Sequence, residues 1–312
     1  SPSLLLEANE FGSILHASME AIYRELTGSS DSGNTHTLIE PERIQEKLRT
    51  KGFVRRIVEE QYREQLKLGG KKELSGLGLI YCHSIEQYVR QILELDLTFA
   101  PFEYQESEKH HYTSFPLSNG ERVYFGGIID RVDKVGSRLR VVDYKTGSEE
   151  TRMPKWDLLL DSKYKAILQT LIYCTFLAES GVPKDEIYPA IYMLRGDYGL
   201  MVKGKGYDPL VQLPLDTYGN SSNSPELPAS PTLAQAPLSS EGNSAKGSGA
   251  KSPKKQKKLQ TTLLSYAEAE APFREVFIHG VLDELYDAST PFAQTPKEEN
   301  CRYCPFALSC GR

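Results

Sequence analysis

The chain has 312 residues, enough for one large domain or two small ones and for a sizeable buried core. Its formal net charge of -5 gives no overall attraction to nucleic acid. A binding channel needs only a local positive field, however, so this total does not exclude a nucleic-acid enzyme. No apolar run approaches membrane-spanning length, which excludes a transmembrane helix from the expected elements.

The sequence carries no visible export signal. Five cysteines in a chain without a signal peptide indicate a reducing, cytoplasmic compartment. In such a compartment, clustered cysteines suggest a metal site rather than disulfides. Because the chain begins at Ser1 without a methionine, we expect it to be a fragment of a longer protein.

The first predicted element is a helix over residues 10–27. Apolar residues recur along it at helical spacing and form one stripe: Leu15, Met19, Ile22 and Leu26. His16 and Glu20 lie beside this stripe, four residues apart on a shared face. A lone histidine in such a place is usually a packed core residue, and Glu20 is also explained as a solubilising charge.

Further helices are predicted before the first long strand. Residues 28–36 are rich in Ser, Gly, Asp and Asn and indicate a loop. Residues 41–68 predict two charged helices that are split near Gly52, with Pro41 at the start of the first. A further helix is predicted over 78–95.

A β-meander follows these helices. Its strands are predicted at 110–117, 121–133 and 138–145, with turn signals at Asn119-Gly120 and Gly136-Ser137. A helix over 162–179 and strands near 187–194 and 199–204 complete the core. This order predicts an α/β fold in which a mixed central β-sheet is flanked by helices, with a helical N-terminal part.

Two acids and a lysine stand out in the meander. Asp130 follows Ile128-Ile129, and Asp143 follows Val141-Val142, so each acid interrupts an apolar run where an unpaired charge is costly. Asp143 and Lys145 project from the same face of one strand. Acids supply hard oxygen ligands, and a lysine supplies a compact positive charge. Together they can hold a divalent metal against a phosphate, whereas the alternative is a surface hairpin with solvated charges.

Four further polar residues receive roles from their positions on a helix and a strand. Gln169 and Tyr173 are four apart on one helix face and can reach one site together, or they are ordinary amphipathic residues where the helix meets the sheet. Arg131 points to the face opposite Asp130, so we expect a structural role. Asp133 is expected to support the site or the hairpin.

The composition changes over residues 213–258. This stretch is rich in Ser, Pro, Gly, Ala and Asn and predicts a disordered low-complexity insertion. It ends in a run of lysines that either touches a nucleic-acid backbone or is a solvated linker: Lys246, Lys251, Lys254, Lys255, Lys257 and Lys258. A helix from Leu263 to about Tyr286 is expected to pack back on the core.

The C-terminal tail holds three closely spaced cysteines, Cys301, Cys304 and Cys310. Such clustering indicates a metal site, and we expect the three side chains to converge on one point. A zinc site completed by a histidine such as His279 is one alternative. Cys174, within the helix over 162–179, is expected to be a buried apolar filler.

These motifs together resemble a known family. Asp130 with Asp143-Tyr144-Lys145 resembles the core signature of the PD-(D/E)XK nuclease superfamily, in the form of its RecB/AddB-type branch. Two further matches are Gly12 to His16 with that branch's Gly-x-x-x-His motif and Gln169 to Tyr173 with its Gln-x-x-x-Tyr motif. The four elements occur in this order over residues 12–173.

The resemblance implies a restriction-endonuclease-like core and assigns roles within it. It implies that His16, Asp130, Asp143 and the carbonyl of Tyr144 bind Mg²⁺ or Mn²⁺. It implies that Lys145 orients water or stabilises the transition state, that Gln169 contacts that lysine or the substrate, and that Tyr173 lines the channel. Asp130, Asp143, Lys145, Gln169 and Tyr173 are thus the predicted catalytic set.

The resemblance also implies a use for the tail. The C-x₂-C-x₅-C spacing of Cys301, Cys304 and Cys310 resembles that of three ligands of a four-iron four-sulfur cluster in AddB-type nucleases. The fourth ligand of that family lies upstream of Gly12, where this chain has no cysteine, so we expect an incomplete cluster here. Cys82 is a candidate substitute.

The expected protein is a metal-dependent deoxyribonuclease, from the C-terminal end of a bacterial helicase–nuclease for DNA repair or recombination. It would hydrolyse single-stranded DNA as an exonuclease and work with a helicase domain or subunit. The alternative is an inactive nuclease-fold module that binds DNA or a helicase partner. The expected domains are a nuclease core with N-terminal helices over 1–212, the insertion over 213–258, and a C-terminal helix with the cysteine-rich tail over 259–312.

Overall fold

The fold is described from a computed structural model of the chain. The structure describes residues 6–28, 36–68, 74, 76–147, 149–194, 208–215, 261–291, 293–296, 298–302 and 304–311. Within these residues, no helix combines the length and the apolar character needed to cross a membrane.

Helices and strands follow the predicted order. The helices are α1 (Ala8–Thr27), α2 (Pro41–Arg49), α3 (Phe53–Gln65), α4 (Leu77–Phe99), α5 (Lys165–Glu179), α6 (Tyr266–Arg274) and α7 (Asp283–Leu285). The strands are β1 (Thr37–Ile39), β2 (Phe102–Pro116), β3 (Arg122–Val135), β4 (Arg138–Lys145), β5 (Ile187–Met193), β6 (Gln212–Pro214) and β7 (Thr261–Leu263). A π-helical segment, η3 (Glu275–Leu282), joins α6 to α7, so one helical stretch runs from Tyr266 to Leu285. The predicted start at Leu263 is wrong, because Leu263 is the last residue of β7.

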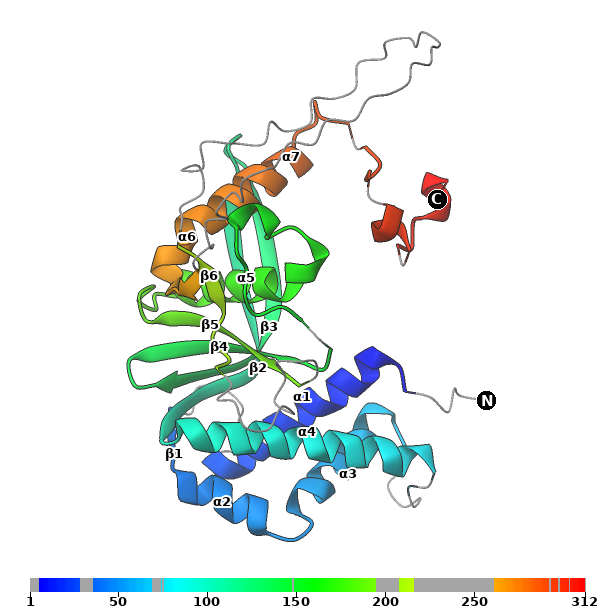
Figure 1. Ribbon diagram of the computed structural model, residues 1–312, viewed down its shortest axis with the longest axis vertical. Helices are drawn as coiled ribbons and strands as arrows, with labels where there is room; N and C mark the ends of the chain where they lie inside the picture. The colour runs from blue at the N-terminus through cyan, green and yellow to red at the C-terminus, as the bar shows by residue number, and fades with distance from the viewer. Residues whose placement is uncertain are drawn as a thin grey trace, which may run out of the picture.

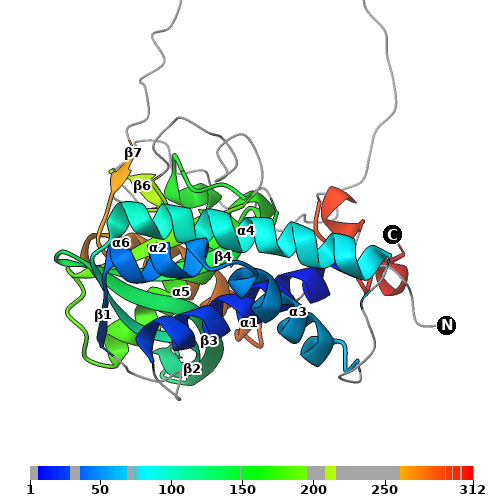
Figure 2. The same ribbon diagram turned by 90° about the horizontal axis from the view of Figure 1, so that it is seen from below.

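The central sheet has five strands in the order β1-β2-β3-β4-β5. Strands β1 to β4 pair antiparallel, and β5 adds in parallel to β4 after the crossover through α5. The sheet is therefore mixed and flanked by helices, which confirms the predicted fold class. In Figure 1, α1 to α4 cover one face of this sheet and α5 and α6 the other; Figure 2 looks onto the layer of α1 to α4.

Alternation along the strands explains the two layers. On β4, Val142 and Tyr144 belong to the hydrophobic cluster under α1, α3 and α4, whereas Leu139 and Val141 belong to the cluster under α5 and α6. Successive side chains of a strand point to opposite faces, so a strand that is buried on both faces serves two cores. A carboxylate on such a strand therefore needs a partner or a ligand.

Several predicted boundaries are corrected. Strand β2 begins at Phe102 rather than 110, because its polar residues hide an alternation in which Phe102 and Tyr104 are buried. The short strand β1 was not predicted. The insertion predicted from residue 213 starts too early, since Leu213 is buried in β6. The predicted strand at 199–204 and the rest of the insertion, with its run of lysines, lie outside the described residues.

The helix boundaries in the N-terminal layer agree with the prediction. Helices α2 and α3 are separated at Gly52, whose φ of 77° lies in the left-handed region that favours glycine. Pro41 is the first residue of α2, where its missing N–H costs nothing. On the other side of the sheet, Cys174 is buried within α5, as expected for an apolar filler.

Candidate active site

The central hairpin brings the two predicted acids together. Strands β3 and β4 pair with Arg131 opposite Val142, so Asp130 lies across from Asp143. Both carboxylates are buried, with 6% and 1% of Asp130 and Asp143 exposed. The Tyr144 backbone N–H donates to Asp130 Oδ2 over 2.7 Å, which fixes this carboxylate relative to β4.

A chain of hydrogen bonds leads from Asp143 into α5. Lys145 Nζ donates to Asp143 Oδ1 and to Gln169 Oε1, each over 2.9 Å. Gln169 Nε2 in turn donates to the Tyr173 hydroxyl over 2.6 Å. The helical spacing of Gln169 and Tyr173 thus serves one network, as the sequence predicts. The ammonium group is held at a single position between a strand and a helix.

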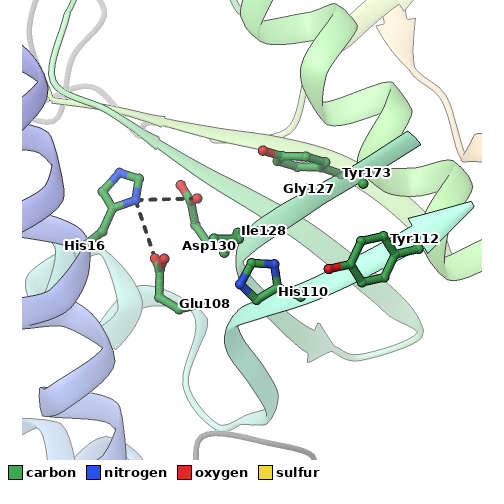
Figure 3. A pocket seen from close by; sticks show the side chains of 9 residues that line it. His16, Glu108, His110, Tyr112, Gly127, Ile128, Asp130 and Tyr173 are labelled. Carbon is green, nitrogen blue, oxygen red and sulfur yellow. Dashed lines mark ion pairs between the residues drawn. The ribbon is translucent and has the colours of Figure 1, made fainter. Parts of the chain in front are cut away.

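Helix α1 supplies the histidine from the opposite layer. Figure 3 shows His16 pointing from α1 towards Asp130 and Glu108, with the two ion pairs dashed. His16 Nδ1 lies 3.5 Å from Asp130 Oδ1, and His16 Nε2 lies 3.2 Å from the Tyr144 carbonyl oxygen. His16 is therefore not an isolated packing residue, and the carbonyl of Tyr144 is part of the same cluster.

Glu108 is the member of the cluster that the sequence analysis missed. Its Oε1 lies 3.4 Å from His16 Nδ1, and this buried oxygen has no hydrogen-bond partner among the described residues. Its φ of 47° lies in the left-handed region, where a non-glycine residue is strained. The pairs on either side of it, Ser107 with Arg131 and Lys109 with Ile129, make Glu108 the cross-strand neighbour of Asp130.

A signal for Glu108 was present in the sequence. A hairpin through the Asn119-Gly120 turn places residue 108 beside residues 130 and 131 of the next strand, but the strand was predicted to start at 110. Glu20, in contrast, does not join the cluster. Its carboxylate pairs with Arg24 over 2.8 Å on the surface of α1, which agrees with the alternative of a solubilising charge.

His16, Glu108 and Asp130 fit a divalent cation. Their ligand atoms all lie within 4.8 Å of one another. Neighbouring ligands of an octahedral ion with bonds of about 2.1 Å lie roughly 3 Å apart, close to the 3.4 and 3.5 Å distances from His16 Nδ1. When Nε2 donates its proton to the Tyr144 carbonyl, Nδ1 turns a lone pair towards two carboxylates. Only a cation between them, a proton or a metal, makes that arrangement favourable.

The protonation states support the same conclusion. Burial, together with the neighbouring Asp130, raises the pKa of Asp143 to about 7 against the opposing effect of Lys145. Burial also raises the pKa of Asp130 above its ordinary value. Burial alone would lower the pKa of His16, but the carboxylates of Asp130 and Glu108 outweigh it and raise that pKa to about 9. A cation bound to this cluster would therefore compete with protons on His16 and Asp143.

The cluster opens into a cavity of about 600 Å³. Its lining comes from α1, the β2–β3 hairpin and α5: His16, Glu108, His110, Tyr112, Gly126, Gly127, Ile128, Asp130 and Tyr173. Gly127 makes room for α5, since a Cβ there would lie 3.0 Å from the Tyr173 ring and 3.3 Å from Phe176. The cluster of His16, Glu108 and Asp130 is therefore accessible from the hairpin side.

Arg131 and Asp133 belong to a buried ion-pair network, which agrees with the structural role expected for Arg131. Arg131 is fully buried on the opposite face of β3 and pairs with Asp96 over 2.9 Å and with Asp133 over 2.8 Å. Asp133 also pairs with Arg140 over 2.6 Å. This network lies directly behind the site and connects β3 to α4.

The tail cysteines do not assemble at zinc-ligand distances. Zinc–thiolate bonds of about 2.3 Å require sulfurs roughly 4 Å apart. In the described part of the chain, Cys301, Cys304 and Cys310 do not form a group within 4.8 Å. Cys82 is buried among the N-terminal helices, and His279 pairs with Asp283 over 3.0 Å, so neither is placed to complete a site. Figure 1 shows the tail standing off from the sheet.

Comparisons with known proteins agree with this geometry. The family model described as the PD-(D/E)XK nuclease superfamily matches residues 2–311. The chain is also 33% identical over 102 residues to a subunit of the ATP-dependent helicase/deoxyribonuclease of Acetivibrio thermocellus. That match covers 30% of this chain and 8% of the relative, so it spans a small part of a much longer protein. With acids on neighbouring strands, a lysine two residues after the second, and a family match over nearly its whole length, the chain belongs to the PD-(D/E)XK nuclease superfamily.

Proposed function

We propose that this protein is a metal-dependent deoxyribonuclease that hydrolyses phosphodiester bonds. The observation that carries the proposal is the convergence of His16, Glu108 and Asp130 within 4.8 Å, beside the Asp143–Lys145 pair. Mg²⁺ or Mn²⁺ suits this donor set, since two carboxylates supply hard oxygens and one imidazole supplies nitrogen. When bound, such an ion neutralises phosphate charge and lowers the pKa of an attacking water.

The side chains of the site have separate tasks in this proposal. Asp130 and Asp143 provide the negative charge that retains the cation. The Tyr144 carbonyl accepts a hydrogen bond from His16 Nε2 and so turns Nδ1 towards the cation. Lys145 presents a positive charge to the phosphate oxygens, whose charge grows in the transition state. Gln169 holds Lys145 in place, so that the ammonium group does not need to reorganise during the reaction. Tyr173 fixes the amide orientation of Gln169.

The relative named above supports the choice of DNA and of a helicase partner. We propose that the chain acts as the nuclease domain of a helicase–nuclease and degrades a single strand from its end. The nuclease core over 1–212 and the C-terminal part over 259–312 then work as one unit, because α6 packs in the same hydrophobic cluster as α5. The competing function, a nuclease-fold module that binds without cutting, is disfavoured by the complete Asp130, Asp143, Lys145 and Gln169 set.

Cleavage of end-labelled DNA tests the proposal. The purified chain should shorten linear single strands with Mg²⁺ or Mn²⁺, leave them intact in EDTA, and spare circular single strands. Glu108→Gln should raise the Mg²⁺ concentration for half-maximal rate by roughly tenfold or more, because it removes one charged ligand.

Glu103→Gln on the same strand is the matched control, since Glu103 pairs with His36 away from the site. It should leave the metal requirement unchanged. A folded chain that binds DNA but cuts nothing at any metal concentration would support the binding module instead.

The metal should stabilise the fold more at high pH. The pKa of Asp143 in the folded protein, about 7, lies above its ordinary value of 3.8, so its contribution to metal-free stability is lost as pH rises from about 4 to 7. For His16, with a pKa of about 9 against an ordinary 6.5, the loss occurs between those values. The cation replaces both protons, so its stabilising effect grows by about 1.4 kcal/mol per pH unit for each proton released.

Melting temperatures with and without saturating Mg²⁺, measured from pH 5.5 to 8.5, check this expectation. The difference should widen with pH, and in Asp143→Asn the part of this increase below about pH 7 should be lost, because only the His16 proton remains to be replaced. A difference that is independent of pH in the parent protein would contradict proton competition at the cluster.

We also propose that the tail cysteines bind an iron–sulfur cluster only when another segment supplies a fourth thiolate. Cys82 and Cys174 are buried in separate hydrophobic clusters, so neither reaches the tail. Replacing Cys301, Cys304 and Cys310 together with serine should therefore change the melting temperature of this chain by no more than a few degrees. Iron and sulfide analysis after anaerobic purification provides the second measurement. Stoichiometric iron in this chain, lost with a large drop in melting temperature on substitution, would show a complete site.

A further inference from the structure

The cavity at the cluster continues outwards along one face of the β2–β3 hairpin. Residues of the two strands are paired across this face: His110 with Ile128, Tyr112 with Gly126, Ser114 with Tyr124, and Pro116 with Arg122. The inner part of this face is continuous with the cluster, since Tyr112, Gly126 and Ile128 line the same cavity as Glu108 and Asp130. At about 3.3 Å per residue, Tyr112 lies roughly 13 Å along the strand from Glu108, and Ser114 roughly 20 Å.

Two aromatic rings stand open to solvent on this face. Tyr112 is 76% exposed and Tyr124 is 81% exposed. The other face of the same hairpin is core, where Phe115 packs edge-on against Phe277 of η3. The exposed face therefore carries tyrosines that the core does not use, next to a site that acts on a polymer. Exposed aromatic rings beside a pocket offer apolar surface that a ligand can cover.

The ring of Tyr112 lies over Gly126 of the neighbouring strand, beside the ring of His110. It stacks with the ring of His110, with centroids 6.4 Å apart and planes 10° from parallel. Gly126 leaves the space that the ring occupies, since a Cβ there would lie 2.7 Å from Tyr112 Cδ1 and 2.8 Å from Cε1. Any side chain at position 126 would push the ring off the strand. Figure 3 shows Tyr112 and His110 along β2, beside the cluster.

We propose that this face is a stacking platform for the unpaired bases of the DNA strand whose scissile phosphate lies at the His16–Glu108–Asp130 cluster. The proposal rests on the nuclease function proposed above and assigns its single-strand preference to Tyr112 and Tyr124. Every base presents a π-face, so stacking on aromatic rings tolerates any sequence but requires the base to be free of its complement. Arg122, at the outer end of the face, is an exposed cation whose guanidinium donates to the Ser114 hydroxyl and carbonyl, which holds its charge beside Tyr124 for contact with the DNA backbone.

Binding without cleavage tests the platform separately from the chemistry. The parent is the whole chain carrying Asp143→Asn, in EDTA, with fluorescently labelled single-stranded and blunt duplex oligonucleotides. Tyr112→Ala and Tyr124→Ala should each weaken single-strand binding by about tenfold and leave duplex binding unchanged. Tyr112→Trp should retain the affinity. Tyr286→Ala, which removes a 48% exposed ring beyond α7, is the matched control and should have no effect.

Two further measurements distinguish stacking from a structural role of the ring. In single strands with 2-aminopurine at successive positions, fluorescence should be quenched where the base stacks, and Tyr112→Ala should remove that quenching. Gly126→Ala keeps Tyr112 but displaces its ring, so it should reproduce the loss of binding. A lower melting temperature without weaker binding would show that Tyr112 only covers Gly126, and would overturn the proposal.

The remaining outcomes are equally decisive. Equal loss of single-strand and duplex binding in the tyrosine variants, or no measurable single-strand binding by the parent, would overturn the platform. Ring-dependent binding by a chain that cuts nothing even with Asp143 intact would overturn the nuclease function but keep the platform. Normal cleavage, with DNA binding that does not depend on the two rings, would overturn the platform but keep the nuclease function.

Discussion

Replacing Asp143 with asparagine is expected to lower the rate of DNA cleavage by about 10²–10³-fold without unfolding the protein. The carboxylate lies across from Asp130 and holds Lys145 through its Oδ1. Asparagine keeps an oxygen for that hydrogen bond but removes the charge that retains a cation. The rate should be measured with end-labelled single strands at saturating Mg²⁺.

The same change should not destabilise the metal-free protein. Burial and the adjacent Asp130 already raise the pKa of Asp143 to about 7, so the buried charge is a cost in the absence of metal. The melting temperature of Asp143→Asn in EDTA should therefore equal or exceed that of the unchanged chain, and the gain on adding Mg²⁺ should be lost. Such a trade-off between stability and activity is typical of a functional site.

Asp185→Asn is the matched control for this prediction. Asp185 is exposed in the turn before β5, and its replacement should affect neither the rate nor the melting temperature. Near-normal cleavage by Asp143→Asn, from a preparation free of other nucleases, would refute the proposed role of this residue.

Arg131→Ala should produce the largest loss of stability, about 3–5 kcal/mol in the free energy of unfolding. The guanidinium is fully buried and donates hydrogen bonds to the hydroxyls of Tyr23, Tyr144 and Tyr192. Its removal leaves Asp96 buried without its cationic partner, and an uncompensated buried charge is costly. The free energy of unfolding of a typical domain is only about 5–15 kcal/mol, so the loss is a large fraction of the total stability. Urea denaturation measures it.

Arg138→Ala on the same hairpin provides the control. Arg138 is exposed, and its guanidinium lies 5.4 Å from the centroid of the Tyr188 ring. An exposed contact of this kind contributes about 0.5–1 kcal/mol. Equal losses for Arg131→Ala and Arg138→Ala would show that the buried network is not a principal source of stability.

Arg131 also connects the site to the N-terminal layer. Its partner Tyr23 lies on α1, two turns after His16, and its partner Tyr144 supplies the carbonyl beside His16. The network therefore fixes α1 against β4, and with it the distance from His16 to Asp130. The sequence indicated a structural role for Arg131 from strand alternation, but the partner Asp96 was not predicted.

The residues that the sequence located best are those whose position follows from local rules. Asp143 and Lys145 share a face because strand residues alternate, and Gln169 and Tyr173 share a face because helix residues recur after four. The pairing of Asp130 with Asp143 follows from a short hairpin. The order of helices and strands follows from apolar periodicity, which needs no knowledge of distant contacts.

The tertiary structure alone decided what depends on contacts between distant segments. Glu108 joins His16 because β2 bends at a strained residue and α1 packs across it, and neither event leaves a periodic signal. The sequence by itself determined the family motifs, the mixed α/β fold and the two acids with their lysine. Only the packing of α1 and α4 on the sheet decided that His16 faces carboxylates rather than core, and that Arg131 meets Asp96. The physical reason is that a buried charge is placed by partners that lie far away in the sequence, whereas periodicity records only which face of an element is buried.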